Sequence, residues 1–258
     1  DSNFNNNNSP QRGGAIFATE SEVNISNSMF LDNISSAGGA VYVNNSLINI
    51  SDSEFSDNSS TNGSGGAIES YISQLYATNV HFSYNLAGDT GGAVRVLHGY
   101  GDFTKCLFNQ NSAGCGGGIE VSSSNSMIKG STLYENISGC GGNIRAVDNS
   151  NVQIINSILY NDSYLDWYSS NNSQTEISYS LNNVYYDSNE YLDVSNIIAN
   201  PEFLDPQNDD FSLQITSPCI DTGDPGTELD FDGTIADMGA YTFDQIQNPI
   251  TRGCMNPE

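Results

Sequence analysis

One series of residues in this sequence has the types and the regular spacing that chemistry on an acidic sugar needs. Its members recur every 25 to 27 residues, and the last four alternate in sign: Tyr42, Glu69, Arg95, Glu120 and Arg145. His98 follows three positions after Arg95. β-Elimination on a uronic polysaccharide requires a base beside a cation that stabilises the carboxylate-bearing intermediate. The series therefore predicts a candidate carbohydrate-binding face, on which Arg95, Arg145 and His98 supply parts of such a site.

The same series also fits a purely structural role. If its residues lie one above another on neighbouring strands, the alternating charges form a ladder of ion pairs, each worth about 0.2–1 kcal/mol when exposed. No cluster of three Asp recurs in the series, so the carboxylate triad of a polygalacturonase-like hydrolase is not visible. A chain with a net charge of −25 also repels a polyanion unless calcium bridges the two. Both interpretations, a ligand face and a structural ladder, fit the sequence.

A second candidate site is a group of closely spaced carboxylates near the end of the chain: Asp221, Asp224, Asp230, Asp232 and Asp237. Carboxylates in a loop suit Ca²⁺, a hard cation that prefers oxygen ligands. The run Asp230-Phe-Asp-Gly233 matches only the opening of an EF-hand loop and lacks its later Glu. The alternatives are therefore a calcium site, the one cofactor that the sequence suggests, and a solvated acidic turn.

Two markers with a common period indicate the elements that position these residues. The first is a Gly-Gly pair, which begins at Gly13, Gly38, Gly65, Gly91, Gly116 and Gly141. The second is Phe or Leu three residues before Asn, which gives a column of Asn7, Asn33, Asn58, Asn85, Asn111 and Asn136. Between the markers, apolar and polar residues alternate in short runs such as 41–43 and 47–50, the pattern of β-strands. A unit of about 26 residues without a helix cannot bury its apolar face alone, so the units must stack.

The sequence therefore predicts an all-β fold, a right-handed parallel β-helix built from six stacked coils of about 26 residues. Parallel strands lie about 4.8 Å apart, so equivalent residues of successive coils form columns. Phe30 and Phe55 in one column, and Val23 and Ile48 in another, are expected to face inward. The Asn column is expected at a bend, as a structural ladder whose amides bond to one another and to turn backbone.

The cysteines are placed by the same repeat. Cys115 and Cys140 each precede a Gly-Gly pair and so share a column on adjacent coils. A separation of about 4.8 Å lies within the Cα distance that a disulfide accepts. We expect either a disulfide, which would indicate an oxidising compartment, or two free and partly buried thiols. Cys106 falls in a column of inward Ser residues and is interpreted as a small buried residue.

Composition restricts the partners of the chain. Six Lys and Arg against 31 Asp and Glu give a surface that repels nucleic acid and anionic lipid headgroups. No run of 18 apolar residues occurs, so we expect no direct membrane insertion. Ten Asn-x-Ser sequons would permit N-glycosylation in a cell that performs it, but four of them lie in the ladder, where no glycan could attach: Asn7, Asn33, Asn58 and Asn136.

The Gly-Gly-Ala-Ile/Val and Phe-x-x-Asn repeats of residues 1–162 resemble those of the polymorphic outer-membrane proteins of Chlamydia and of pectate-lyase-like β-helix proteins. Residues 152–243, approximately, are similar to the ending of choice-of-anchor Q surface proteins, because they contain in order Asn200-Pro-Glu-Phe, Ser217-Pro-Cys-Ile, Asp230-Phe-Asp-Gly and Asp237-Met-Gly-Ala. Within this stretch, residues 163–243 depart from the regular repeat. We expect irregular terminal coils and a cap that closes the stack there. Residues 244–258 are expected to be a linker and the start of a truncated Cys-bounded repeat, in which Cys254 has lost its partner.

The resemblance implies the fold but not an activity, because such coils carry both adhesins and polysaccharide-degrading enzymes. We predict a non-catalytic, extracellular or cell-surface segment of a larger protein, serving as an adhesin, a stalk or a filament building block. Its expected partners are carbohydrate, another cell-surface protein or other copies of itself. The alternative is a polysaccharide lyase or a carbohydrate-binding β-helix that acts on an acidic polysaccharide.

Overall fold

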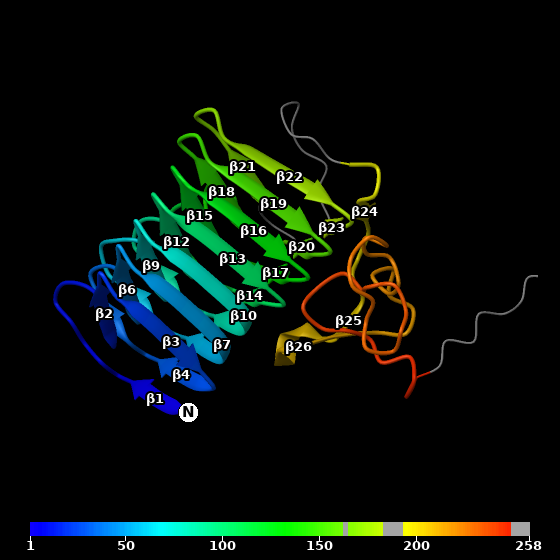
Figure 1. Ribbon diagram of the computed structural model, residues 1–258, viewed down its shortest axis with the longest axis horizontal. Coiled ribbons are helices and arrows are strands. Elements are labelled where there is room, and N and C mark those ends of the chain that lie inside the picture. Colours follow the sequence, from blue (N-terminus) through cyan, green and yellow to red (C-terminus); the bar gives the residue numbers. More distant parts are fainter. Residues whose placement is uncertain (162–164, 183–192, 249–258) are drawn as a thin grey trace, which may run out of the picture.

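The computed structural model describes residues 1–161, 165–182 and 193–248, which wind into a parallel β-helix of about seven turns (Figure 1). Equivalent residues of successive turns pair in register from Ile16 to Trp167, at intervals of 25, 27, 26, 25, 25 and 23 residues. The predicted parallel β-helix is confirmed. It has a seventh turn beyond the six that the Gly-Gly repeat indicates.

Each turn contributes one strand to a seven-stranded parallel sheet, which consists of β2 (Ile16–Thr19), β6 (Val41–Asn44), β9 (Ile68–Tyr71), β12 (Val94–Leu97), β15 (Ile119–Ser122), β18 (Ile144–Val147) and β21 (Trp167–Ser169). In the first six turns this strand follows a Gly-Gly pair. The first glycine of each pair has a φ between +58° and +67°, a region that residues with a Cβ rarely adopt. A Cβ on the second glycine would overlap the backbone of the next turn. The Gly-Gly pair is therefore required by the turn that starts the strand.

A fourteen-stranded sheet forms the other sides of the coil, in two parallel rows. The first row contains β3 (Glu22–Ser26), β13 (Tyr100–Thr104), β16 (Asn125–Lys129), β19 (Asn151–Ile155) and β22 (Gln174–Ser178). The second row contains β1 (Ser2–Asn5), β4 (Ser28–Leu31), β14 (Leu107–Asn109), β17 (Thr132–Tyr134), β20 (Ile158–Tyr160), β23 (Leu181–Asn182) and β24 (Ile197–Ile198). Two long strands, β7 (Leu47–Ser56) and β10 (Gln74–Ser83), belong to both rows. A three-stranded sheet then completes the turn with β5 (Ile34–Ser35), β8 (Ser59–Ser60) and β11 (Leu86–Ala87).

Aromatic rings stack along the interior of the coil. Ring centroids in the second row follow one another at 4.5–5.3 Å, in the order Phe4, Phe30, Phe55, Phe82 and Phe108. Val23, Ile48 and Leu75 pair in register in the first row, as expected. Full burial of one such aliphatic side chain contributes about 1.5–3 kcal/mol. Because each turn packs only on its neighbours, stability accumulates along the stack.

The Asn column occupies the corner after the second row, where its amides form a continuous ladder. In Asn58, the backbone N–H and the Nδ2 group both donate to Oδ1 of Asn85, each over 3.0 Å. The same Nδ2 group donates to the carbonyl oxygen of Phe30 over 2.9 Å. This pattern repeats along the column, whose members are fully buried except the first, Asn7. The amide hydrogen bonds offset the cost of burying polar groups.

The C-terminal segment, residues 200–243, lies along the side of the coil (Figure 1). It contains the antiparallel pair β25 (Phe203–Asp205) and β26 (Asp210–Leu213), with a 3-10 helix at Pro206–Asn208 between them. Phe211 and Met238 pack on Leu107 and Ile158, which face outward from the second row. The apolar partners of residues 200–243 therefore lie on the flank of the coil. The cap expected within residues 163–243 stays a prediction.

The strand pairing also continues past residue 162, where we expected the regular coils to end. Within the seventh turn β21 pairs with β18 and β22 pairs with β19. Cys254, and with it the expected Cys-bounded repeat, lies outside the described residues. In the part of the chain that the structure describes, no helix is long and apolar enough to cross a membrane.

Replacing Asn85 by Ala removes one rung from the middle of the Asn ladder. The backbone N–H and Nδ2 of Asn58 then lose their buried acceptor. Each unsatisfied buried group costs about 1–3 kcal/mol, so we expect the free energy of unfolding to fall by about 3–5 kcal/mol. Urea denaturation measures this change, with Asn62→Ala in an exposed loop as the control, expected to shift it by less than about 0.5 kcal/mol. Equal losses in the two variants would contradict the role given to the ladder.

Candidate functional site

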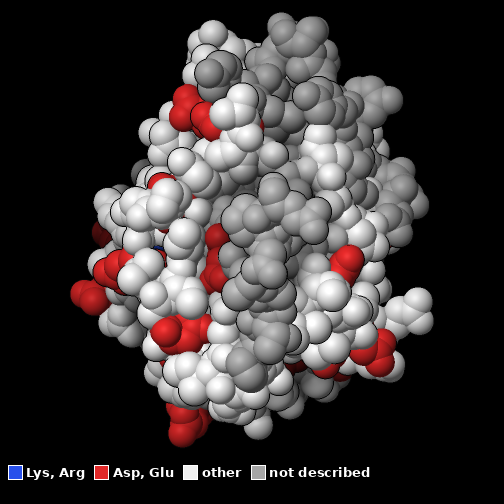
Figure 2. All heavy atoms as spheres, turned by 90° about the vertical axis from the view of Figure 1, so that its right-hand side faces the viewer, with Lys and Arg blue, Asp and Glu red and all other residues white. Residues whose placement is uncertain are grey.

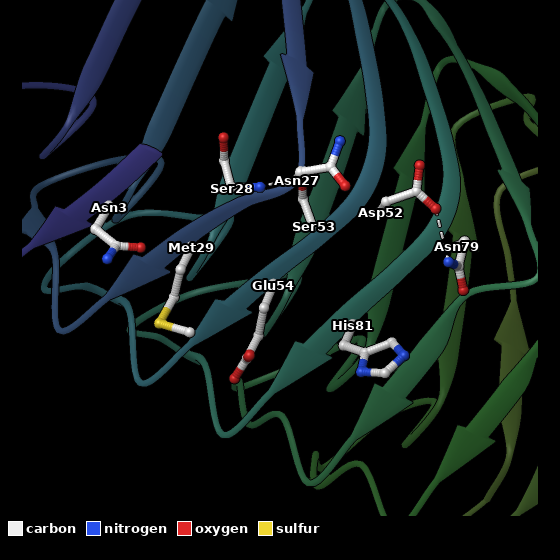
Figure 3. A pocket seen from close by; sticks show the side chains of 9 residues that line it. All are labelled: Asn3, Asn27, Ser28, Met29, Asp52, Ser53, Glu54, Asn79 and His81. Carbon is white, nitrogen blue, oxygen red and sulfur yellow. Dashed lines mark hydrogen bonds between the residues drawn. The ribbon is translucent and has the colours of Figure 1, made fainter. Parts of the chain in front are cut away.

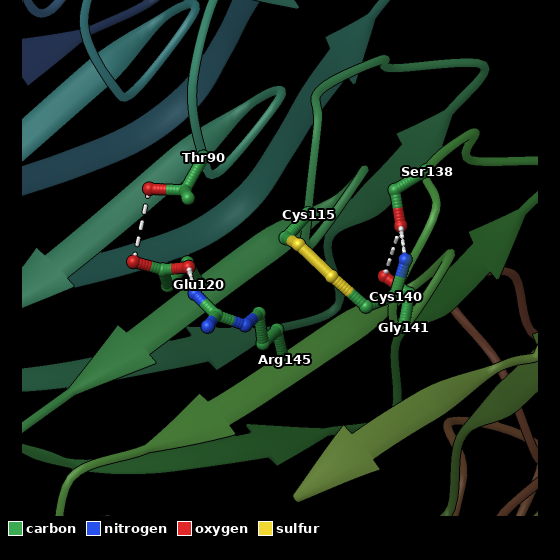
Figure 4. Close-up of a disulfide and its surroundings, with 7 residues drawn as sticks. All are labelled: Thr90, Cys115, Glu120, Ser138, Cys140, Gly141 and Arg145. Carbon is green, nitrogen blue, oxygen red and sulfur yellow. Dashed lines mark hydrogen bonds and ion pairs between the residues drawn. A yellow bond between two sulfur atoms is a disulfide. The ribbon is translucent and has the colours of Figure 1, made fainter. Parts of the chain in front are cut away.

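The charged series forms a column on the seven-stranded sheet, with Glu69, Arg95, Glu120 and Arg145 in register on β9, β12, β15 and β18. Arg95 bridges two carboxylates. Its Nη1 lies 3.3 Å from Oε1 of Glu69, and its Nε lies 3.2 Å from Oε1 of Glu120. Nη1 of Arg145 lies 2.5 Å from Oε2 of Glu120 (Figure 4). The two positive and two negative charges of this ion-pair column therefore neutralise one another.

Loops that precede the Gly-Gly pairs cover much of the ion-pair column. Glu120 is 1% exposed, and its Oε1 also accepts a hydrogen bond from the Thr90 hydroxyl over 2.9 Å (Figure 4). Glu69 is buried too, and this burial raises the pKa of its carboxyl group against the opposing effect of Arg95. Tyr42, next in the series, is 3% exposed. The surface position expected for this series is therefore wrong for Tyr42, Glu69 and Glu120, because the loops fold over the outer face of the sheet.

This burial determines what the two Arg side chains can do. Arg95 and Arg145 are only about a fifth exposed, and their guanidinium groups are paired with Glu69 and Glu120. A uronate carboxylate would have to separate those buried pairs, at a cost of about 3–5 kcal/mol. His98 is exposed at the corner after β12, and no hydrogen bond or ion pair links its ring to the column in the described part of the chain. Neither Arg95 nor Arg145 is therefore a free cation, and the ring of His98 is not joined to either of them among the described residues.

A disulfide joins Cys115 and Cys140, whose Cα atoms are 4.8 Å apart. It connects equivalent loops of adjacent turns, next to the ion-pair column (Figure 4). With a sequence separation of 25 residues, such a cross-link contributes on the order of 3 kcal/mol by restricting the unfolded chain. Cys106 and Cys219 are buried thiols, and burial raises the pKa of each to about 12. Both thiols therefore remain protonated at neutral pH.

The acidic group near the C-terminus accepts hydrogen bonds from the turns around it, through Asp221, Asp224, Asp230, Asp232 and Asp237. Asp237 is the most buried of them and accepts from the N–H groups of Asp221 and Phe243 over 2.8 and 2.6 Å. Burial, assisted by the charges of Asp230 and Asp221, raises the pKa of Asp237 to about 6. Among the described residues, no group of three or more His, Cys, Asp or Glu is arranged to hold a metal ion. The carboxylates are thus engaged by the hydrogen-bond donors of the turn, and the calcium site stays a prediction.

A groove on the outer surface of the first three turns brings together side chains that the sequence analysis does not single out (Figure 3). It has a volume of about 460 Å³ and is lined by two columns of residues, with Asn3, Ser28 and Ser53 beside them. The first column stands at the corner between the two rows and consists of Asn27, Asp52 and Asn79. The second faces outward in register on β4, β7 and β10 and consists of Met29, Glu54 and His81. We call this hollow the corner groove.

The residue types in the two columns of the corner groove have different physical reasons. The corner residues have φ values of +46° to +54°, a region that Asn and Asp adopt more readily than most residues. Nδ2 of Asn79 also donates to Oδ1 of Asp52 over 2.8 Å, which links two turns (Figure 3). Glu54 and His81 lie within strands, where the backbone makes no such demand. Their identity is therefore not explained by the fold.

The C-terminal segment meets one end of the corner groove. The Tyr241 hydroxyl lies 3.1 Å from Nε2 of His81. Burial lowers the pKa of His81, against the effect of Glu54, and it raises the pKa of Tyr241 to about 12. Both groups are therefore uncharged at neutral pH. Beyond His81 the same outward column continues with Leu107, which is buried beneath the C-terminal segment.

A sequence signal for the groove exists, because Met29, Glu54 and His81 each immediately precede the Phe of the Phe-x-x-Asn marker. Polar residues at one position of a repeat do not by themselves indicate a site. The contact with Tyr241 spans 160 residues and follows no repeat, so only the folded chain reveals it.

Comparison with known proteins supports the repeat. Residues 1–19 and 52–71 match the Chlamydia polymorphic membrane protein (Chlamydia_PMP) repeat. No curated protein matches the chain. Both matched segments contain a Phe-x-x-Asn and a Gly-Gly marker, and together with the stacked turns they support a β-helix repeat protein. The likeness to pectate-lyase-like and choice-of-anchor Q proteins stays a prediction.

Replacing Glu120 by Gln tests the structural role of the ion-pair column. The variant leaves the guanidinium groups of Arg95 and Arg145 without their shared buried carboxylate. We expect the free energy of unfolding to fall by about 3–5 kcal/mol, the usual result of breaking a buried pair from one side. Urea denaturation provides the measurement. The matched control is Glu176→Gln, an exposed position on β22, where a change below about 0.5 kcal/mol is expected. A Glu120 variant as stable as this control would show that the column is solvated.

Proposed function

We propose that this chain is a non-catalytic β-helix segment of a larger protein, located at the cell surface or outside the cell, where it serves as an adhesin or stalk. The observation that carries the proposal is the burial of the ion-pair column. The residues with the best spacing for catalysis on uronic sugars are paired with one another and covered by loops. They therefore stabilise the scaffold.

The location is supported by the match to a polymorphic membrane protein repeat, which suggests a surface or outer-membrane passenger region. The Cys115–Cys140 disulfide agrees with it, because such bonds persist in oxidising compartments outside the cytosol. The acidic surface agrees as well. Figure 2 shows Asp and Glu scattered over the face that it presents, where Lys and Arg are almost absent. A strong net charge of one sign keeps an exposed protein soluble.

A stalk requires rigidity along its axis, and three kinds of contact between turns contribute to it. The Asn ladder, the stacked Phe rings and the ion-pair column each cross from one turn to the next. A bend between two turns would have to break whichever of these contacts join them. The chain therefore suits a role in which a contact site is held at a fixed distance from an anchor.

The polysaccharide lyase alternative has weaker support than the adhesin. Its cation and base would come from Arg95, Arg145 and His98, and these do not converge on a free site. Carbohydrate or another surface protein remains the proposed partner of the adhesin.

The location can be tested on cells of the source organism. An antibody raised against the purified chain should label intact cells, because the segment is exposed at the surface, whereas an antibody against a cytosolic protein should label only permeabilised cells. Secreted material should react in the culture medium. Labelling that appears only after permeabilisation would contradict the proposed location.

A further inference from the structure

We infer that the corner groove binds a glycan with free amino groups, represented by an oligomer of glucosamine. This inference rests on the proposed adhesin role and deepens it, since it names the contact site and the chemistry of the sugar. The charge of this ligand is opposite to that of the acidic polysaccharide expected for the lyase alternative.

Charge is the first argument. The groove is lined by the carboxylates of Asp52 and Glu54, and none of its lining residues is Lys or Arg. His81, the one other ionisable side chain among them, has a pKa lowered by burial and so adds no positive charge at neutral pH. The only two Lys residues of the chain line a different hollow under the C-terminal segment. An amine is therefore attracted into the corner groove, whereas a uronate is repelled.

The repeat of the groove is the second argument. Its lining residues recur once per turn, at about 4.8 Å along the stack. A polymer that runs along the stack meets an amide or carboxylate at each turn, first at Asn27, then at Asp52 and then at Asn79. Beside these, the Met29 thioether and the His81 ring offer less polar surface for the face of a sugar ring (Figure 3). Such an alternation of polar contacts with apolar patches suits a carbohydrate.

The pairing of the strands beneath the groove is unfavourable for a peptide ligand. The strands beneath the groove already have neighbours on both sides, since β4 lies between β1 and β7, and β10 lies between β7 and β14. A peptide bound by strand addition needs an unpaired sheet edge, which this region does not provide. Only side chains are presented to a ligand here, and these match hydroxyl and amino groups.

The C-terminal segment of the chain already binds to the outward column that lines the corner groove. In the later turns the same outward column contains Leu107, Thr132 and Ile158, all of which are buried. The C-terminal segment packs on this part of the column. In the first three turns the column consists of Met29, Glu54 and His81, and the segment meets it at His81 through Tyr241. A glycan in the groove would thus cover the flank on the side of His81 that the C-terminal segment does not cover.

Isothermal titration calorimetry with the glucosamine tetramer tests the inference on the full chain. We expect binding, with an affinity about tenfold lower in Glu54→Gln and in Asp52→Asn, since each variant removes one charge-assisted contact. The matched control, Glu176→Gln, removes the same charge from an exposed outward position of β22 and should bind like the unaltered chain. Thermal unfolding of each variant checks that the fold is retained, as expected for outward side chains.

Four results would overturn the inference. The first two are no binding of the glucosamine tetramer and equal or tighter binding of a galacturonate tetramer. The third is an equal loss of affinity in the Glu176 control. The fourth is binding of tetralysine as tight as that of the amino sugar, which would indicate general charge attraction. Failure of these titrations leaves the surface location intact if the antibody still labels intact cells. Failure of that labelling removes the adhesin role whatever the titrations show.

Discussion

The hydrogen bonds between corner Asn residues fix each turn of this protein on the next. Each ladder amide uses its backbone N–H and its Nδ2 group on the Oδ1 of the following Asn, and a second Nδ2 bond holds the carbonyl of a Phe in the preceding turn. A turn that slipped by one residue would leave these buried groups unpaired and would reverse the face of every strand residue. The ladder therefore sets the register on which the Phe stack, the ion-pair column and the corner groove all depend.

Once the register is fixed, the environment of a column decides its role. The ion-pair column on the seven-stranded sheet lies under the loops before the Gly-Gly pairs. Its charges are therefore paired with one another within the protein. The outward column of the second row has no such cover in the first three turns. There Glu54 lines the open part of the groove and His81 meets Tyr241, whereas Leu107 and Ile158 of the same column are buried by the C-terminal segment. Outward-facing residues thus stabilise the scaffold in the ion-pair column, and they form a candidate binding surface in the corner groove.

The sequence is informative where structure repeats and uninformative where it does not. The period alone predicts the strand order. It also predicts the pairing of Glu69 with Arg95 and the column shared by Cys115 and Cys140. The burial of Glu120 could not be predicted, because it depends on the path of a loop that carries Thr90 over the sheet. The C-terminal segment has no period, so its position on the flank depends on tertiary contacts between apolar residues.

The seventh turn is a further feature that the sequence period does not predict. It lacks a Gly-Gly pair, yet Trp167 pairs with Ile144. Asp166 takes over the end of the polar network, since it accepts a hydrogen bond from Nδ2 of Asn143 over 2.8 Å. Asn143 in turn accepts one from Asn136, the last rung of the ladder. A marker search stops at the last Gly-Gly pair, whereas the coil continues for as long as another residue can satisfy its final amide.

The carboxylates of this protein divide into a buried structural column and an open groove. Carbodiimide labelling of the native chain with an amine nucleophile, read by peptide mass spectrometry, measures this division directly. We expect rapid modification of Glu54 and Asp52, and protection of Glu69 and Glu120 until the chain unfolds. Modification of Glu120 at the rate of Glu54 in the folded protein would contradict this division, because the ion-pair column would then be solvated and free to meet a ligand.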